Sequence, residues 1–174
     1  ASNAAIATSK LGTGAVLQTK YYQLSTAITS SSQTWTDLGS FSVSITPSST
    51  SNFILLSANF GSCIGSSSNN TTAFRFTRNG TPVAYGDQVG SSRDRASFRT
   101  SSIGKLMNGD SNHAISVSFD AIDAPSSTSA LTYKIQHENE NGTVYINRSV
   151  AYADIASIHD ATFFSSFIVQ EIAG

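Results

Sequence analysis

Residues 72–85, TAFRFTRNGTPVAY, decide the fold because they predict a β-hairpin with one apolar side. Asn79 and Gly80 at its centre tolerate positive φ, as both central positions of a two-residue type I′ turn require. The turn folds the two halves of the segment onto each other as antiparallel strands. Pro82 cannot donate a ladder hydrogen bond, so we expect the return strand to be an edge strand or to be bulged.

The register of this hairpin divides its side chains between two sides. Phe76 faces Val83 and Phe74 faces Tyr85, and cross-strand pairs of this kind add roughly 0.2–1 kcal/mol each. These four side chains therefore predict a buried side. The solvent-facing side is predicted to carry Arg75, Thr77, Pro82 and Ala84.

A polar stretch, residues 86–95 with the sequence GDQVGSSRDR, follows the hairpin and is the first candidate site. Saccharide recognition needs an aromatic face together with Asp, Asn, Arg or Gln side chains that read hydroxyl groups. The alternative is that the charged residues form ion pairs within the loop or across a subunit boundary. The candidate ligand contacts are Tyr85, Asp87, Gln88, Arg93, Asp94 and Arg95.

A second polar stretch, residues 137–148, has the same mixture of aromatic, amide and charged side chains. Its alternative interpretation is a solvated hairpin tip around residues 138–141. Arg148 has a further interpretation, because it follows the apolar Val144 and Ile146 and could pair across a seam between subunits. The candidate contacts here are His137, Glu138, Asn139, Glu140, Asn141, Tyr145, Asn147 and Arg148.

Alternation of apolar and polar residues predicts strands along most of the chain. Residues 53–56, FILL, are apolar throughout, which is typical of a central strand covered on both faces. We expect nine to eleven strands, and short strands separated by Gly, Ser and Asn turns favour an antiparallel β-sandwich of the jelly-roll type. The other predicted strands are residues 15–29, 33–38, 40–46, 96–103, 113–122, 130–137 (turning at Asn141-Gly142 into 143–149) and 162–172.

Size and composition limit the possible functions. A chain of 174 residues suits one domain, here residues 15–174, preceded by a small-residue leader at residues 1–14. Charged residues are 12% of the chain and the net charge is -1, so no basic footprint for nucleic acid is present. No apolar run is long enough to insert into a membrane. The single cysteine, Cys63, excludes an internal disulfide and is expected to be a buried thiol.

Several segments together resemble a known family. They are NAAIATSKL at 3–11, GAVLQ at 14–18, SVSITPSSTSNFILL at 42–56, FRFTRNGTPVAYGD at 74–87, TYKIQ at 132–136 and GTVYINRS at 142–149. They are similar to the C-terminal domains of tail fibres and related virion structural proteins of tailed bacteriophages, especially those of aquatic environments.

The resemblance implies a homotrimer that is part of the virion and is assembled in the host cytoplasm. It implies host recognition by distal loops and attachment to other virion proteins through the N-terminal end. Leu11, Val16 and Arg148 are the candidate subunit-interface residues. The first functional hypothesis is therefore a trimeric tail-fibre head that adheres to a host-surface receptor, a glycan or a protein. The second is a virion decoration or assembly protein on the tail or the capsid, without receptor binding.

A polysaccharide depolymerase is the third hypothesis, and it ranks last. Such an enzyme needs a carboxylate pair at a cleft. His113, His137 and His159 are isolated, and no serine stands in a G-x-S-x-G elbow. We expect no enzyme activity, no cofactor and no metal site within one chain. A metal ion on a trimer axis, held by three copies of one His or Asp, stays open at this point.

Overall fold

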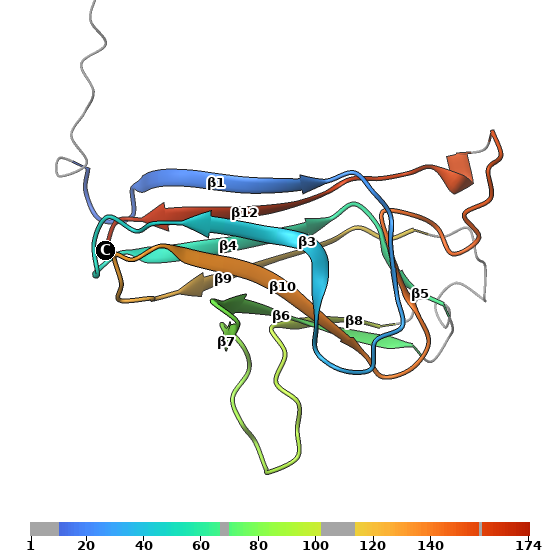
Figure 1. Ribbon diagram of the computed structural model, residues 1–174, viewed down its shortest axis with the longest axis horizontal. Coiled ribbons are helices and arrows are strands. Elements are labelled where there is room, and N and C mark those ends of the chain that lie inside the picture. The colour runs from blue at the N-terminus through green and yellow to red at the C-terminus, as the bar shows by residue number, and fades with distance from the viewer. Residues whose placement is uncertain (1–10, 67–69, 102–113, 157) are drawn as a thin grey trace, which may run out of the picture.

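The computed structural model describes residues 11–66, 70–101, 114–156 and 158–174. These residues form antiparallel sheets that stack as a β-sandwich (Figure 1). They contain twelve strands, one more than the upper end of the predicted nine to eleven. The predicted leader lies mostly outside the described residues, as does His113.

Two larger sheets and one small sheet make up the described structure. The first sheet has the order β1 (Val16–Leu24), β12 (Ser165–Ile172), β4 (Phe53–Phe60), β9 (Val117–Asp123). The second sheet has the order β3 (Thr36–Ile45), β10 (Leu131–Asn139), β6 (Thr71–Arg78), with β7 (Thr81–Val83) and β8 (Phe98–Ser101) both paired to β6. The small sheet is β2 (Ile28–Ser30), β11 (Val144–Ile146), β5 (Cys63–Gly65), and η3 (Ile158–Asp160) is a 3-10 turn.

The predicted hairpin is present as β6 and β7. Asn79 and Gly80 both have positive φ, 50° and 84°, as the two-residue turn requires. Phe76 pairs with Val83 in the predicted register. Strand β7, which contains Pro82, lies at the edge of the second sheet, as the missing N–H group of proline predicted.

The far end of that hairpin differs from the prediction. Strand β7 stops at Val83, because Ala84 takes a left-handed conformation (φ 51°) that turns the chain out of the sheet. Phe74 therefore pairs with Phe98 of β8 instead of Tyr85. The Phe74 and Phe98 rings stack with centroids 4.9 Å apart, which places a second aromatic side chain on the core side.

Thr77 was predicted on the solvent-facing side, and this prediction is wrong because the side chain is buried. Its register neighbours on the same face of the second sheet are Lys134 and Pro82. These larger side chains flank the Thr77 hydroxyl and screen it from water.

The core lies between the inner faces of the two larger sheets. The predicted alternation is confirmed in β3, β9 and β10, whose odd-numbered residues from Phe41, Val117 and Leu131 onward face inward. Aromatic rings dominate the centre, and neighbouring centroids lie 4.5–6.2 Å apart. Cys63 is fully buried, as expected, and burial raises the pKa of its thiol to about 12. The aromatic cluster consists of Phe60, Phe74, Phe76, Phe98, Phe119 and Phe167.

The prediction of one long strand over residues 15–29 is wrong. The chain forms β1 in the first sheet and β2 in the small sheet. The buried Asn147 side chain explains the break, because its amide donates to the carbonyls of Leu24 and Thr26 and holds the crossing segment in place. In residues 33–46 the structure has one strand where two were predicted. The two segments merge into β3 through Gly39, which has φ 53°.

The predicted hairpin between residues 130–137 and 143–149 does not form either. Strand β11 pairs with β2 and β5, not with β10. Thr143 is the anchor: its N–H donates to the Ser66 hydroxyl, and its carbonyl accepts from Ser66 N and from the Asn70 amide. These bonds pull the start of β11 toward the loop after β5.

The first sheet leaves one face uncovered in the single chain. Strand β4 is central in that sheet, but only its even-numbered residues are buried, and Phe53 remains 41% exposed. The prediction that residues 53–56 are covered on both faces is therefore wrong, because no third layer lies over them in the described part of the chain. The register places the following side chains on this outer apolar face: Val16, Tyr21, Phe53, Leu55, Ile122, Ile168 and Ile172.

An ionic contact joins the two larger sheets. Arg78 of β6 lies 2.7 Å from the Asp123 carboxylate of β9, and the Tyr133 hydroxyl of β10 donates to the same oxygen at 2.7 Å. Burial, followed by the hydrogen bond to Asp123, raises the pKa of Tyr133. The phenol therefore stays protonated and acts as a permanent donor between the sheets.

Candidate ligand-binding site

The segment between β7 and β8, residues 84–97, leaves the sandwich as a protruding loop, which we call the excursion (Figure 1). Its root is closed by a backbone bond from Gly86 N to Ala96 O, and Arg95 Nε donates to Gly86 O at 2.7 Å. The Gln88 amide donates to the carbonyls of Gly90 and Arg93, so these tip contacts are internal. The excursion is therefore fixed where it meets the second sheet.

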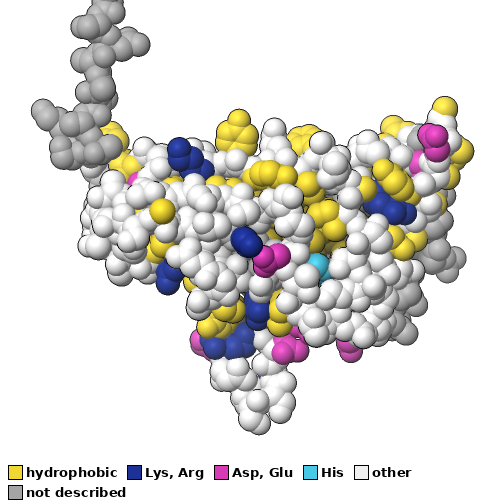
Figure 2. All heavy atoms as spheres, viewed as in Figure 1, with side chains coloured by type: hydrophobic (Ala, Val, Ile, Leu, Met, Phe, Trp, Pro, Cys, Tyr) yellow, Lys and Arg dark blue, Asp and Glu magenta, His cyan; other side chains and the backbone are white. Residues whose placement is uncertain are grey.

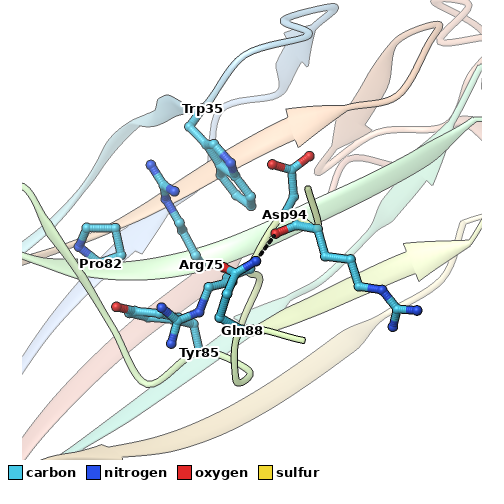
Figure 3. A pocket seen from close by; sticks show the side chains of 8 residues that line it. Trp35, Arg75, Pro82, Tyr85, Gln88 and Asp94 are labelled. Atoms are coloured by element: carbon cyan, nitrogen blue, oxygen red, sulfur yellow. Dashed lines mark hydrogen bonds between the residues drawn. The ribbon is translucent and has the colours of Figure 1, made fainter. Parts of the chain in front are cut away.

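A hollow of about 340 Å³ lies at the root of the excursion, against the outer face of the second sheet (Figure 3). Trp35, Arg75 and Pro82 come from the sheet side, and the excursion supplies the other walls. Figure 2 shows basic and acidic side chains gathered where the excursion meets the sandwich. The lining residues of this stacked-arginine hollow are Trp35, Arg75, Pro82, Tyr85, Gln88, Arg93, Asp94 and Arg95.

Two guanidinium groups stack on aromatic rings in this hollow. The Arg75 guanidinium carbon lies 4.1 Å from the Trp35 ring centroid, and that of Arg95 lies 4.0 Å from the Tyr85 centroid. A stacked guanidinium contacts the ring through its plane, while its N–H groups point outward in that plane. Both arginines thus keep donors available to a ligand.

A chain of hydrogen bonds holds Arg75 in place. Arg75 Nε donates to Gln136 Oε1 at 2.9 Å, and Gln136 Nε2 donates to Asp37 Oδ1 at 2.8 Å. Lys134 Nζ closes the chain at 2.7 Å from Asp37 Oδ2. The hydrogen bonds from Lys134 and Gln136 hold the pKa of Asp37 below its ordinary value, so this anchor is a carboxylate at neutral pH. Arg75 is therefore positioned across three strands before any ligand arrives.

The electrostatics of Arg75 reflect its partial burial. Burial lowers the pKa of its guanidinium, and the nearby carboxylates of Glu138 and Asp94 oppose that shift. Because an arginine begins above pH 12, it stays charged at neutral pH. The stacked-arginine hollow therefore contains a permanent cation on its sheet side.

A second hollow of about 640 Å³ shares Asp94 with the first. It is more acidic, and burial followed by the negative charge of Asp94 raises the pKa of Glu138. The two hollows are therefore adjacent, with Asp94 at their boundary. The second hollow is lined by Gln33, Thr71, Ala73, Asp94, Ala96, Phe98, Arg99, Glu138, Asn139 and Glu140.

Most residues predicted from the first polar stretch meet in the stacked-arginine hollow. Tyr85, Gln88, Arg93, Asp94 and Arg95 all line it. Asp87 is exposed on the excursion but is not part of the lining. The alternative of ion pairs within the loop is not seen, since none joins its arginines to Asp94 within the described residues.

The second polar stretch divides between surface and core. Glu138 and Glu140 line the second hollow, but His137 is only 2% exposed, and its Nε2 lies 2.7 Å from Ser30 Oγ. The prediction that His137 contacts a receptor is therefore wrong. The strand period explains this, because the inward alternation of β10 continues past Ile135 to residues 137 and 139.

Asn139 is also a structural residue, although its atoms reach the wall of the second hollow. Its amide donates to the carbonyls of Ser30 and Ser32, and its oxygen accepts from the Thr72 hydroxyl. It is 1% exposed, so no free donor remains for a receptor. The predicted contact role of Asn139 is corrected to a bridge between β6, β10 and the segment after β2.

Tyr145 and Arg148 lie together, away from both hollows. The Arg148 guanidinium carbon is 4.5 Å from the Tyr145 centroid and 4.2 Å from that of Tyr152. Its donors reach the carbonyls of Ser149 and Val150. These contacts lie within one chain. The receptor role of Tyr145 and the seam role of Arg148 stay predictions. Of the other interface candidates, Val16 is on the outer apolar face and Leu11 is half-buried.

Sequence reasoning missed Trp35, Arg75 and Pro82 as parts of the site. The available signal was the hairpin period, which places Arg75 and Pro82 on the side opposite the phenylalanines. Nothing in the local sequence shows that Trp35 lies beside them. That proximity arises from β10, which pairs with β3 on one side and with β6 on the other.

The sequence matches no protein-family model, and no curated protein matches it either. No helix among the described residues is long and apolar enough to cross a membrane. The same residues contain no group of three or more His, Cys, Asp or Glu side chains arranged to hold a metal ion.

Proposed function

We propose that this chain is the trimeric head domain of a bacteriophage tail fibre and that it adheres to a glycan on the host surface. The observation that carries the proposal is the stacked-arginine hollow. It combines aromatic rings, an amide at Gln88, a carboxylate at Asp94 and preorganised guanidinium groups, the mixture with which proteins read sugars. The resemblance of the sequence to tail-fibre domains supplies the biological setting, the virion.

The sandwich is proposed to be a jelly roll. The support is the strand order after the short β2, β5, β7 and β11 are set aside. Counted along the chain, the remaining eight strands lie in the orders 1-8-3-6 and 2-7-4-5. Strands that alternate between two four-stranded sheets in this way are those of a double Greek key.

The homotrimer is proposed from the outer apolar face of the first sheet. Tyr21 is 68% exposed and Ile122 is 64% exposed on it, and contiguous apolar surface of this kind marks interaction sites. A partner copy that covers this face leaves the outer face of the second sheet, with both hollows, pointing away from the seam. Each site is shallow, so the repeated copies on a virion raise the overall affinity by roughly 100-fold or more.

Retention on bacteria tests adhesion. The full chain and its Arg75→Ala/Arg95→Ala variant are incubated with a panel of aquatic bacterial isolates, and the bound fraction is measured after washing. We expect retention on a subset of isolates and its loss in the variant. The matched control is Lys20→Ala, an exposed cation on β1, which is expected to bind as well as the unaltered chain. Equal retention of all three proteins would contradict the proposal.

The second candidate function is a virion decoration or assembly protein that acts through the outer apolar face, without host contact. The exposed outer apolar face favours it, because that face can also clamp a different virion subunit. Antibody labelling of intact virions separates the two. Label at fibre tips supports the head domain, and label across the capsid surface supports decoration.

The depolymerase hypothesis gains one observation: Asp94 and Glu138 line the same hollow, and the pKa of Glu138 is raised. We still propose that no bond is broken, because both carboxylates lie near the Arg75 guanidinium and offset its charge. Release of reducing sugar from host polysaccharide, abolished by Glu138→Gln, is the result that would replace adhesion by cleavage.

A further inference from the structure

The charge of the stacked-arginine hollow is unbalanced. Its lining contains three arginines, Arg75, Arg93 and Arg95, and one aspartate, Asp94, and the Glu138 carboxylate near Arg75 reduces the formal local surplus to one positive charge. The whole chain has a net charge of -1, so this surplus is local. Within the described residues, none of the three arginines has an ion pair with a carboxylate. A positive, concave surface of this kind concentrates anions.

The hydrogen bonds of the two stacked arginines leave their terminal nitrogens available. Arg75 uses Nε for Gln136, and Arg95 uses Nε for Gly86 O. A guanidinium has five N–H donors, so four on the two Nη atoms of each residue remain. No acceptor for these donors is seen among the described residues. The paired Nη groups form a planar fork that matches a carboxylate or a phosphate.

The hollow is preorganised for such a group. The Trp35 and Tyr85 rings hold the two guanidinium planes, and the Asp37–Gln136 chain fixes Arg75 from the sheet side. Fixing the donors in advance reduces the ordering cost of binding. A neutral sugar would leave the fork donors paired only with hydroxyl oxygens, whereas an anionic group forms the stronger, charge-assisted bonds.

We infer that the saccharide bound in the stacked-arginine hollow is acidic and that its carboxylate or phosphate lies against Arg75 and Arg95. This inference rests on the proposed adhesive function and specifies its ligand class. Asp94, at the boundary of the two hollows, accepts hydrogen bonds from sugar hydroxyls and repels a second anion. The neighbouring uncharged sugars of the saccharide then extend into the second hollow.

The test measures binding of the immobilised full chain to matched probes by biolayer interferometry at pH 7. The carboxylate arm compares alginate with its carboxyl-reduced derivative. The phosphate arm compares phosphorylated dextran with unmodified dextran. We expect Kd for one acidic form to be lower than for its neutral counterpart by at least about tenfold, as the loss of a hydrogen bond to a charged group implies. We also expect that preference to weaken at 0.5 M NaCl.

Variants assign the preference to the hollow. Arg75→Gln/Arg95→Gln removes both charges and is expected to bind the acidic probe no better than the neutral one. Lys20→Gln removes one charge from the first sheet and is expected to keep the preference. The arm that shows the preference identifies carboxylate or phosphate as the recognised group.

The outcomes separate the inference from the function on which it rests. Adhesion to bacterial isolates together with equal binding of the acidic and neutral probes, or with binding of neither, overturns the acidic ligand and leaves adhesion standing. A preference that survives in the double variant also overturns it, because the charge then acts elsewhere. Absence of adhesion to every isolate instead removes the proposed function.

Discussion

The outer faces of the two larger sheets differ in chemistry although they enclose the same core. The first sheet presents apolar side chains such as Tyr21 and Ile122 to solvent. The second presents a hydrogen-bonded chain from Lys134 to Arg75 and the two hollows. Since both sheets have the same period-two alternation, the difference comes from the side chains at outward positions. The outer face of the first sheet is therefore suited to a protein partner, and that of the second sheet to a polar ligand.

The largest expected effect comes from placing a charge on the apolar face. Ile122→Glu introduces a carboxylate where a partner copy is proposed to pack, and burial of an unpaired charge costs several kcal/mol. We expect the trimer to dissociate to monomers by light scattering, with an unchanged circular-dichroism spectrum. Thr81→Glu, on the edge of the second sheet, is the control and is expected to stay trimeric. If the unaltered chain is already monomeric, the assignment of the outer apolar face to a partner copy is wrong.

The next effect tests whether the two faces belong to one cooperative unit. Asp123→Ala removes the acceptor shared by Arg78 and Tyr133 and leaves the buried phenol without a partner. We expect the free energy of unfolding to fall by about 3 kcal/mol, measured by urea titration. The control Asp120→Ala changes an exposed carboxylate on the same strand and is expected to shift stability by less than about 0.5 kcal/mol. Two separate unfolding transitions would show that the sheets are not coupled.

A smaller effect concerns the ring that holds Arg75. Trp35→Ala removes the stacking surface of the guanidinium, a contact worth about 0.5–2 kcal/mol. We expect about tenfold weaker binding to the isolate or probe that the unaltered chain retains. The free energy of unfolding is expected to fall by no more than about 2 kcal/mol, because Trp35 is half-buried. Trp35→Phe keeps an aromatic face and is expected to lose less. Unchanged affinity in Trp35→Ala would remove the ring from the site.

The smallest expected effect is a difference between the two sheets in the pH range over which each loses stability. Burial lowers the pKa of His137 in the second sheet, so the folded chain binds this proton less readily than the unfolded chain, whose value is near 6.5. Stability therefore falls as pH drops below about 6.5, with a slope of at most about 1.4 kcal/mol per pH unit. Urea titrations between pH 7.5 and 5 measure this slope. His137→Gln is expected to flatten it, and an equal slope in the variant would assign it elsewhere.

Glu171 sets the pH range in which the first sheet loses stability. Burial alone raises the pKa of its carboxyl, but hydrogen bonds from Gln18, Asn52 and Ser48 outweigh burial and hold it below the ordinary 4.5. The folded chain therefore loses this stabilisation only as pH falls below about 4.5. The second sheet is thus expected to respond to mild acid before the first.

Much of the fold followed from local patterns. The turn at Asn79-Gly80 and the alternation in β3, β9 and β10 depend on neighbours in sequence, so a single chain segment reveals them. The strand break near Leu24 and the position of β11 do not, because Asn147 and Thr143 make the deciding hydrogen bonds with segments about 70–120 residues away.

The candidate site divides in the same way. The loop residues Tyr85, Gln88 and Asp94 were found because their stretch is polar and contiguous. Trp35 and Arg75 were missed because the strand order of the second sheet brings them together. That order cannot be deduced from local sequence patterns. His137 differs for another reason: its neighbours in sequence are polar, but its position in the alternation of β10 decides its burial.

The closed root of the excursion has an evolutionary consequence. The bonds at Gly86, Ala96 and Arg95 secure its two ends, while the residues between them are exposed and bond among themselves. Substitutions or insertions at positions 87–92 therefore leave the sandwich intact. Under the proposed adhesive function, variation at this tip would change the ligand that is recognised and leave the supporting body unchanged.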